Sequence, residues 1–291
     1  MFSRMRTRSS TGTSWEPIER LREALEGAEA VIVGAGAGLS AAAGFDYGGA
    51  RFRARFADFE AKYGFHDMYA GGFYPYRTEG ERWAFWSRSI LINRWDAGVG
   101  EPYRDLLALL KGREYFVLTT NVDHQFQKAG FDKRRLFYTQ GDYGLFQCAR
   151  PCCQKTWDNE AQVRAMAAGE RDMRVPADLL PRCPVCGGPA TTNLRVDGRF
   201  VQDEGWHAAA ARYQDFLRRH GTGRVLYLEL GVGSNTPVII KYPFWRLTAQ
   251  NPEAMYACVN AGEAWAPEGL GDRAILVDGD LSEVLRGLWD G

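Results

Sequence analysis

The sequence predicts an α/β fold: a Rossmann-like parallel-sheet domain with a helical insertion and a small inserted cysteine-rich module. Three observations support this prediction. Short apolar runs alternate with amphipathic segments, as they do when strands and helices alternate along a parallel sheet. The first apolar run leads into residues 34–38, Gly-Ala-Gly-Ala-Gly. Five of the six cysteines lie between Cys148 and Cys186, where the alternation stops.

The composition is that of a globular protein with a large core. The chain has 291 residues, of which 45% are hydrophobic, and its 36 basic residues balance its 36 acidic residues. A zero formal charge gives no electrostatic reason to expect nucleic acid or a membrane surface as a partner. No apolar stretch approaches the roughly 20 residues that a membrane span needs.

The first 14 residues form a segment with arginines and no acids. Arg4, Arg6 and Arg8 lie among several hydroxyl residues. A mitochondrial transit peptide has this composition, but so do many disordered tails, and we interpret residues 1–14 as a tail. No apolar run follows the arginines, so a secretory signal is not expected. We therefore expect an intracellular, cytoplasmic protein, since a mitochondrial location follows only from the transit-peptide interpretation.

The Rossmann-like domain is expected in two segments, residues 15–147 and 196–291. A helical apolar rhythm over 17–29 leads into a strand at 30–33. Further strands are predicted at 115–118, 135–138, 225–230, 255–259 and 274–277. Helices are predicted at 102–111, 123–128, 205–220 and 281–289. Crossover segments of this length between strands favour parallel pairing.

A helical insertion is predicted at about 52–100, where a dinucleotide-binding oxidoreductase would have its second strand. Such a strand should end in an acid about 20 residues after the glycine turn. Instead, Phe52, Phe56 and Phe59 recur at helical spacing, and Glu60 lies within that helix. A second helix with a bulky face follows at 81–95. This pattern argues against a dehydrogenase.

The glycine segment after the first strand is suited to a phosphate group. Glycines at a strand–helix turn let the backbone approach a pyrophosphate, and the helix presents free N–H groups to it. Gly36 and Gly38 lie at this turn. A tight turn, as in any α/β protein, is the alternative interpretation. We expect Phe45 and Phe52, both close to this turn, to cover the nicotinamide of a bound dinucleotide.

Polar residues follow the predicted strand 115–118. Asn121 supplies an amide that can hold ribose hydroxyls, and Asp123 supplies a carboxylate that can bind a carboxamide N–H. Open α/β sheets bind ligands at such strand ends. Asp123 could equally cap the helix that follows. Combined with the glycine turn, the pair predicts a dinucleotide whose glycosidic bond is the target of chemistry.

Three later strand ends carry further candidates. Gln140 can bond a ribose hydroxyl through its amide, but an amide cannot act as a general base. A second glycine turn, with Gly231, Gly233 and Ser234, suits the ribose of adenosine. Asn260 follows the next strand, where it either bonds the adenine or its ribose or simply terminates the strand.

Two close cysteine pairs predict a zinc-binding small module at 148–195. Cys148 and Cys152 are separated from Cys183 and Cys186 by 30 residues. In a reducing compartment such clustering indicates a metal rather than disulfides. Four thiolates form the closed tetrahedral site of structural zinc, and the metal can supply the folding energy of a small module. Cys153 could replace Cys152 as a ligand.

Of the four histidines, only His66 is a candidate for a site role, because it lies in an aromatic stretch. His207 and His220 are expected on the surface. His124 adjoins Asp123 but is expected to point elsewhere at the start of a helix.

These motifs together resemble the sirtuin family over nearly the whole chain. The family pattern Gly-Ala-Gly-x-Ser-x-x-x-Gly fits the first turn at Gly36, Ala37, Gly38, Ser40 and Gly44. The family's Asn-x-Asp signature fits Asn121 and Asp123, and the cysteine pairs, the Gly-x-Ser turn and Asn260 follow in the family's order. The resemblance implies a Rossmann-like domain and a zinc-binding small domain, with NAD and a target protein meeting between them.

Two departures indicate a particular class of the family. Deacylating sirtuins carry a histidine at the position of Gln140, where the imidazole takes a proton from the nicotinamide ribose. They also have an Ile-Pro-Asp-Phe-Arg run where this chain reads Phe45-Asp-Tyr-Gly-Gly, so that Arg51 or Arg53 stands in for the arginine. These changes resemble the macrodomain-linked sirtuins, which are protein ADP-ribosyltransferases with lipoyl carriers of the glycine cleavage H type as acceptors.

The resemblance implies an NAD-dependent protein mono-ADP-ribosyltransferase with Asn121, Asp123 and Gln140 as its catalytic residues. Nicotinamide leaves as a neutral molecule, so its release needs no protein base, whereas deacylation requires further proton removal. A deacylase or an NAD hydrolase is the enzymatic alternative, and an NAD or ADP-ribose sensor is the non-catalytic one. A macrodomain hydrolase that removes the modification would be a separate protein.

Overall fold

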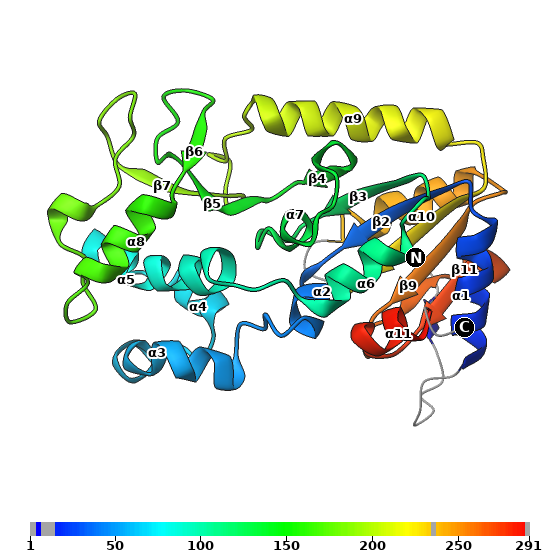
Figure 1. The fold of residues 1–291 in the computed structure, drawn as a ribbon, viewed down its shortest axis with the longest axis horizontal. Coiled ribbons are helices and arrows are strands. Elements are labelled where there is room, and N and C mark those ends of the chain that lie inside the picture. Colours follow the sequence, from blue (N-terminus) through cyan, green and yellow to red (C-terminus); the bar gives the residue numbers. More distant parts are fainter. Residues whose placement is uncertain (1–3, 7–14, 234–236, 289–291) are drawn as a thin grey trace.

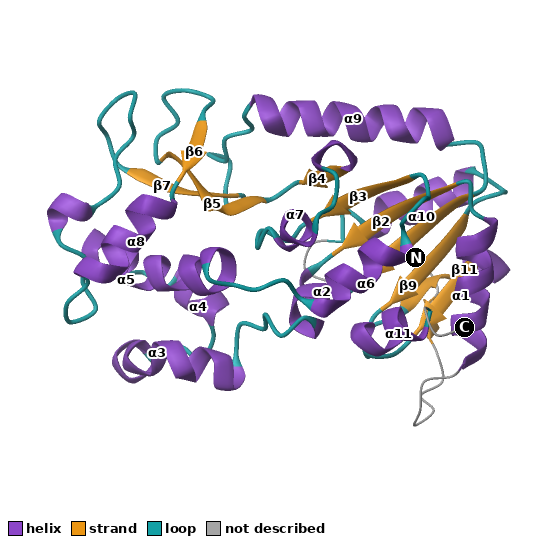
Figure 2. Cartoon of the chain, viewed as in Figure 1, coloured by secondary structure: helices purple, strands orange, loops and turns teal. Residues whose placement is uncertain are grey.

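The structure is a computed structural model that describes residues 4–6, 15–233 and 237–288. It has two parts, which lie at opposite ends of Figures 1 and 2. One is a six-stranded parallel sheet covered by helices, and the other is a smaller body of helices with a three-stranded sheet. This architecture confirms the predicted α/β fold class.

The six strands of the large domain are parallel and almost entirely buried. In spatial order they are β11 (Ala274–Val277), β9 (Met255–Val259), β8 (Val225–Leu230), β2 (Ala30–Ala35), β3 (Tyr115–Thr119) and β4 (Leu136–Tyr138). Burial on both faces explains why these segments are continuous apolar runs. The chain leaves β2 toward β3 and β4, then returns to β8 on the other side of β2. The carboxyl ends of β2 and β8 therefore form the switch point at which such sheets bind ligands.

Helices cover both faces of this sheet. The core on one face includes side chains of α1 (Trp15–Gly27), α2 (Ala37–Ala42), α6 (Glu101–Leu109), α7 (Gln125–Ala129) and α11 (Leu281–Gly287). The core on the other face includes side chains of α9 (Glu204–His220) and α10 (Lys241–Gln250). Among the described helices, none combines the length and apolar character that crossing a membrane requires.

The smaller body joins the helical insertion to the cysteine-rich module. Its helical part is α3 (Gly49–Tyr63), α4 (Met68–Phe73), α5 (Glu79–Ile90) and the π-helical turn Leu91–Trp95. Its other part is an antiparallel sheet of β6 (Thr156–Asp158), β5 (Gly141–Cys148) and β7 (Ala190–Leu194), with helix α8 (Glu160–Gly169). Phe56, Phe85, Phe146 and Met166 lie in one shared core, so the two predicted insertions form one body.

Two predicted boundaries need correction. Strand β5 begins at Gly141, and in the described structure it pairs with β6 and β7. The first segment of the large domain therefore ends before Gly141 and not at residue 147 as predicted. Within the predicted tail, Arg4–Arg6 forms strand β1, which pairs antiparallel with β10 (Trp265–Pro267). Backbone hydrogen bonds to an edge strand order these three residues despite their polar sequence. Residues 1–3 and 7–14 of that segment lie outside the described chain.

The predicted strands at 225–230, 255–259 and 274–277 are confirmed, whereas helix α10 was not predicted. Its first turn contains Pro243, which is tolerated there because the first N–H groups of a helix have no acceptor within it. Three short 3-10 turns complete the described structure, at Lys133–Arg135, Ala177–Leu179 and Glu268–Arg273.

Candidate active site

Two glycine turns meet at the carboxyl ends of β2 and β8. The Gly38 N–H donates to the Gly231 carbonyl at 2.8 Å. A Cβ at Gly36 would lie 2.6 Å from the Gly231 oxygen, and one at Gly38 would lie 2.7 Å from the Gly231 Cα. Gly231 itself has a φ of +59°. Glycine is therefore required for the contact between the turns, a constraint beyond the close approach of a phosphate that the sequence suggested.

The first turn leads into helix α2, which carries several predicted nucleotide-binding residues. Ala37 begins the helix and Ser40 lies buried within it. Gly44 follows the helix with a φ of +81°, a conformation that favours glycine. The Phe45 N–H then donates to the Ser40 carbonyl at 2.9 Å, which ties Phe45 to the end of helix α2, and its predicted contact with nicotinamide stays a prediction.

A buried hydrogen-bonded cluster links this helix to the end of β3. The Ser40 hydroxyl donates to Asp123 Oδ2 at 2.5 Å and lies 2.9 Å from the Tyr103 hydroxyl. The Asn121 amide donates to the Gly36 carbonyl at 3.0 Å and to the Tyr103 hydroxyl at 3.2 Å. The structure thus brings together Ser40, Asn121 and Asp123. It adds Tyr103 from α6, whose place in an amphipathic helix carried no sequence signal.

Asp123 is a buried carboxylate whose described hydrogen bonds come from uncharged donors. It is 6% exposed, and burial raises its pKa, although the hydrogen bonds from Ser40 and the Gln125 N–H act in the opposite direction. The Gln125 N–H donates to Asp123 Oδ1 at 3.1 Å at the start of α7. The N-cap residue of α7 is His124, so Asp123 is not the helix cap. One of its oxygens accepts from the first N–H of the helix, while the other belongs to the cluster with Ser40. Burial also raises the pKa of Tyr103 well above its ordinary value, so its hydroxyl stays protonated.

Gln140 lies at the neighbouring strand end with an unpaired acceptor. The Thr139 N–H donates to the Thr119 carbonyl at 2.9 Å, so Gln140 and Asn121 follow adjacent strand ends. The backbone of Gln140 is held by the Arg195 N–H at 3.0 Å. Its side-chain Oε1, in contrast, is buried and has no hydrogen-bond partner in the described structure. An unpaired buried acceptor costs free energy, and a ligand hydroxyl would satisfy it.

Arg51 connects the segment after the first glycine turn to the smaller body. Its guanidinium donates to the Ile92 carbonyl and to Asn93 Oδ1, both at 2.8 Å, in the π-helical turn Leu91–Trp95. It also donates to the Asp46 carbonyl at 3.0 Å, and its Cζ lies 5.6 Å from the centroid of the Phe45 ring. These contacts favour a role in positioning Phe45, and the predicted contact of Arg51 with a dinucleotide stays a prediction.

The second glycine turn is fixed from β9. The Asn260 amide donates to the Val232 carbonyl at 3.2 Å, between Gly231 and Gly233. Asn260 therefore supports the turn that was predicted to hold adenosine. Ser234, also predicted there, lies outside the described residues.

The four predicted cysteine ligands converge. The sulfur atoms of Cys148, Cys152, Cys183 and Cys186 all lie within 4.8 Å of one another. The Sγ–Sγ distance is 3.8 Å between Cys148 and Cys186 and 3.6 Å between Cys152 and Cys183. Backbone N–H groups, first that of Cys186, lower the pKa of Cys183 to about 7, against the effect of burial. The donor set fits structural zinc, and it contains Cys152 rather than Cys153.

Two histidines contact carboxylates that the sequence did not indicate. His66 is exposed and pairs with Glu60, 2.7 Å from Nδ1 to the carboxylate, on the surface of the smaller body. His124 instead has a left-handed backbone with a φ of +64°, and its Nδ1 contacts the carboxylate of Asp142. His124 therefore has a different partner from Asp123, and it precedes helix α7, which begins at Gln125. The position of His124 could not be inferred from helical spacing.

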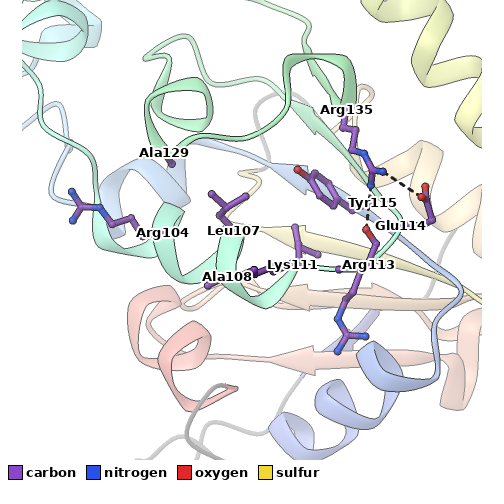
Figure 3. Close-up of a pocket in the computed structure, with 11 residues that line it drawn as sticks. Arg104, Leu107, Ala108, Lys111, Arg113, Glu114, Tyr115, Ala129 and Arg135 are labelled. Atoms are coloured by element: carbon purple, nitrogen blue, oxygen red, sulfur yellow. Dashed lines mark hydrogen bonds and ion pairs between the residues drawn. The ribbon is translucent and has the colours of Figure 1, made fainter.

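A separate hollow of about 650 Å³ lies at the other end of β3 (Figure 3). Tyr115, the first residue of β3, lines it, together with basic side chains that include Arg104, Lys111 and Arg135. Asn121 and Asp123 follow the opposite end of the same strand. The hollow is therefore distinct from the site described above.

The fold is that of the sirtuins. The chain resembles Sir2Tm bound to a propionylated peptide with a TM-score of 0.61 at 19% identity, covering 94% of this chain and 97% of that chain. A Sir2–p53 peptide–NAD⁺ complex has a TM-score of 0.58 at 19% identity, again covering 94% and 97%. A third structure, on the mechanism and regulation of Sir2 enzymes, has a TM-score of 0.62 at 19% identity over 95% and 98%.

Two proteins with similar sequences are both named as ADP-ribosyltransferases. The chain is 33% identical over 236 residues to a probable bifunctional ADP-ribose hydrolase/ADP-ribosyltransferase of Fusarium oxysporum f. sp. cubense, covering 76% of this chain and 38% of that protein. It is 40% identical over 268 residues to a protein ADP-ribosyltransferase of Staphylococcus aureus (strain Mu50), covering 92% of this chain and 85% of that protein. No family model matches the chain. The chain therefore belongs to the protein ADP-ribosyltransferases that have a sirtuin fold.

Proposed function

We propose that this protein is a mono-ADP-ribosyltransferase that moves ADP-ribose from NAD to a side chain of an acceptor protein and releases nicotinamide. The observation that carries the proposal is the unpaired, buried Oε1 of Gln140 beside the strand end that bears Asn121 and Asp123. This position offers a hydrogen-bond acceptor to a sugar hydroxyl and lacks an imidazole that would take a proton.

Each polar residue of the site has a proposed role toward NAD. Asn121, whose amide already lies at the Gly36 carbonyl, positions the nicotinamide ribose. Asp123 binds the N–H of the carboxamide through its carboxylate oxygens. In the structure without ligand, these oxygens accept hydrogen bonds from the Ser40 hydroxyl and the Gln125 N–H. Gln140 accepts from a ribose hydroxyl. The two glycine turns hold the rest of the dinucleotide through Gly36, Ala37, Gly38, Ser40, Gly44, Phe45, Arg51, Gly231, Gly233, Ser234 and Asn260.

The residue at position 140 separates transfer from deacylation. When the bond between ribose and nicotinamide breaks, its electron pair goes to the ring nitrogen, and a neutral molecule leaves. Deacylation requires an additional proton removal from the ribose, and loss of a positioned base typically costs about 10²–10⁴-fold. An amide at position 140 therefore impairs deacylation much more than it impairs breakage of the glycosidic bond.

The acceptor is proposed from the family resemblance: a lipoylated carrier protein of the glycine cleavage H type. Intact-mass analysis of such a carrier, co-expressed with the enzyme and incubated with NAD, tests this. We expect a mass increase of one ADP-ribose unit together with released nicotinamide. Free ADP-ribose alone would indicate a hydrolase, O-acyl-ADP-ribose would indicate a deacylase, and tightly bound, intact NAD would indicate a sensor.

The cysteine cluster is proposed to bind structural zinc. All four sulfur ligands come from the protein, which leaves no open position for substrate. Cys183→Ala should release the metal and destabilise the smaller body, whereas Cys153→Ala, which changes a neighbouring thiol outside the cluster, should do neither. Metal content and melting temperature of the two variants decide this. A Cys183→Ala protein that melts like the parent and keeps its metal would contradict the assignment.

The cysteines also bear on the proposed location. None of the six forms a disulfide in the described structure, a state that a reducing compartment maintains. We therefore propose that the protein works inside a cell, in the cytoplasm. A separate macrodomain hydrolase is the proposed partner that removes the modification.

A further inference from the structure

His124 has a backbone conformation that few residues other than glycine adopt. Its φ is +64°, and the other two non-glycine residues with positive φ in the described chain, Asp172 and Met173, lie in the smaller body. A left-handed histidine is uncommon and carries a conformational cost. His124 lies directly between Asp123 and the first residue of α7. The strained residue is therefore in the loop that carries Asn121 and Asp123.

The side chain of His124 is oriented by Asp142. Its Nδ1 contacts Asp142 Oδ2, and Oδ1 of the same carboxylate accepts from Arg94 Nε at 2.9 Å and from the Gly144 N–H at 2.7 Å. Asp142 is 3% exposed. Burial alone would raise its pKa, but His124 and Arg94 outweigh burial and lower it, so the carboxylate is charged. A proton on Nδ1 then points at Asp142.

This orientation leaves the other ring nitrogen of His124 free. Nε2 makes no hydrogen bond within the described chain, and the side chain is 27% exposed. An imidazole whose Nδ1–H is held by a carboxylate presents a lone pair at Nε2, which is the arrangement of an oriented general base. Asp142 lies two residues after Gln140, so the pair connects the two strand ends of the site.

The charged groups around the imidazole come from four elements. Asp142 belongs to β5 and Arg94 to the π-helical turn. Asp123 lies on the same loop as His124. Lys128 extends from α7 and donates to the carbonyls of Arg94 and Ala97, the latter at 2.6 Å. Two carboxylates and two cations thus lie on the elements next to His124, and among these described groups Asp142 is the one that is hydrogen-bonded to its ring.

We propose that His124, oriented by Asp142, is the general base that receives the proton of the attacking acceptor. The proposal rests on the proposed function. In the step, the bond between C1′ and the nicotinamide nitrogen breaks, and its electron pair stays with nicotinamide. The protic acceptor forms a new bond to C1′, and its proton passes to His124 Nε2 and then to solvent. The histidine supplies the base that an amide at position 140 cannot supply.

The test measures nicotinamide release from NAD in water and in sodium azide. Two variants are used, His124→Asn and His124→Gly, because both residues accept a left-handed backbone. Cleavage of the glycosidic bond needs no base, but capture of the sugar by water does, and uncaptured sugar recombines with nicotinamide. With water as the acceptor, we therefore expect net release to fall about 10²-fold, and the decline of the rate at acidic pH to disappear. Azide is an anion that needs no proton removed, so it should restore release and yield ADP-ribosyl azide.

A matched control is His66→Gln. His66 also pairs with a carboxylate through Nδ1, but on the exposed surface of the smaller body, so its loss should leave the rate and the pH profile unchanged. Asp142→Asn should also lower net release in water, since the ring is no longer oriented by a carboxylate, and azide should restore it. A merely structural contact would give a loss that azide does not restore.

Three results would overturn the assignment. Variants of His124 that keep the parent rate and pH profile would show that no base acts there. Variants that bind NAD but are not restored by azide would assign His124 a structural role only. A parent protein that binds NAD but releases no nicotinamide in water, in azide or with any carrier would contradict the proposed function itself, and the base with it.

Discussion

Two buried carboxylates flank the candidate site, and their partners differ. Asp123 is 6% exposed and accepts from the uncharged Ser40 hydroxyl and Gln125 N–H, so burial raises its pKa. Asp142 is 3% exposed and contacts the basic side chains of His124 and Arg94, which lower its pKa against the effect of burial. The carboxylate proposed to face a ligand makes no ion pair within the part of the chain that the structure describes. The one that organises protein side chains has two basic partners.

The largest expected effect comes from disturbing the cluster around Asp123. Asn121→Ala removes the amide that joins Gly36 to Tyr103 and that is proposed to position the ribose. We expect nicotinamide release to fall by about 10³-fold, the scale of losing a preorganised polar group at a reacting centre. Circular dichroism should show an intact fold, because Asn121 is only half-buried. Retained activity would remove Asn121 from the mechanism.

The next effect concerns stability and the charged partners of Asp142. Arg94→Met leaves a buried carboxylate with His124 as its only basic contact, and removing one member of a buried pair costs about 3–5 kcal/mol. We expect the free energy of unfolding in urea to fall by about 3 kcal/mol. The control is Arg164→Met, whose exposed pairs with Asp96 and Glu160 should contribute about 0–1 kcal/mol. Equal losses in the two variants would contradict the distinction.

Two substitutions compare a hydrogen-bonded polar group of the site with one that has no hydrogen-bond partner. Ser40→Ala takes a donor from Asp123 and should lower the free energy of unfolding by about 1–3 kcal/mol. Gln140→Leu removes an unpaired buried acceptor and should raise it by about 1 kcal/mol, while weakening NAD binding. Urea unfolding without NAD and calorimetric titration with NAD measure both effects. A destabilised Gln140→Leu protein would mean that Oε1 has a partner in solution.

The large domain was predicted well because its strands are short apolar runs with clear ends. The motifs at Gly36, Asn121 and the two cysteine pairs could be recognised because each lies within a few residues of sequence. Recognition of short motifs could not predict the role of Tyr103 or the contact of His124 with Asp142. These contacts depend on how helix α6 and strand β5 pack, and local spacing carries no information about packing.

The smaller body shows the same limit. Phe52, Phe56 and Phe59 were correctly assigned to a helix by their spacing. Their partners Val163 and Met166 lie in the segment that was treated as a separate module held by metal. A sequence pattern reveals that a helix has an apolar face, but it does not reveal which distant segment covers that face. The shared core therefore became visible only in the structure.

The smallest effect is the pH dependence of stability, and its sign differs between the two carboxylates. For Asp123 the folded pKa is raised, so stability falls as pH rises from the unfolded value of 3.8 through the folded pKa. For Asp142 the folded pKa is lowered, so its contribution is present above 3.8 and is lost as pH falls through the folded pKa.

These opposite signs can be measured with Asp123→Asn and Asp142→Asn, each unfolded in urea between about pH 3 and pH 7 alongside the parent. The parent should be more stable than Asp142→Asn near neutral pH, and this advantage should shrink on acidification. Relative to Asp123→Asn, the parent should instead gain stability as pH falls, because its carboxyl group becomes protonated while still buried. Two difference curves with the same slope would mean that Asp123 has a counter-charge in solution, and the contrast between a ligand-facing and an organising carboxylate would not hold.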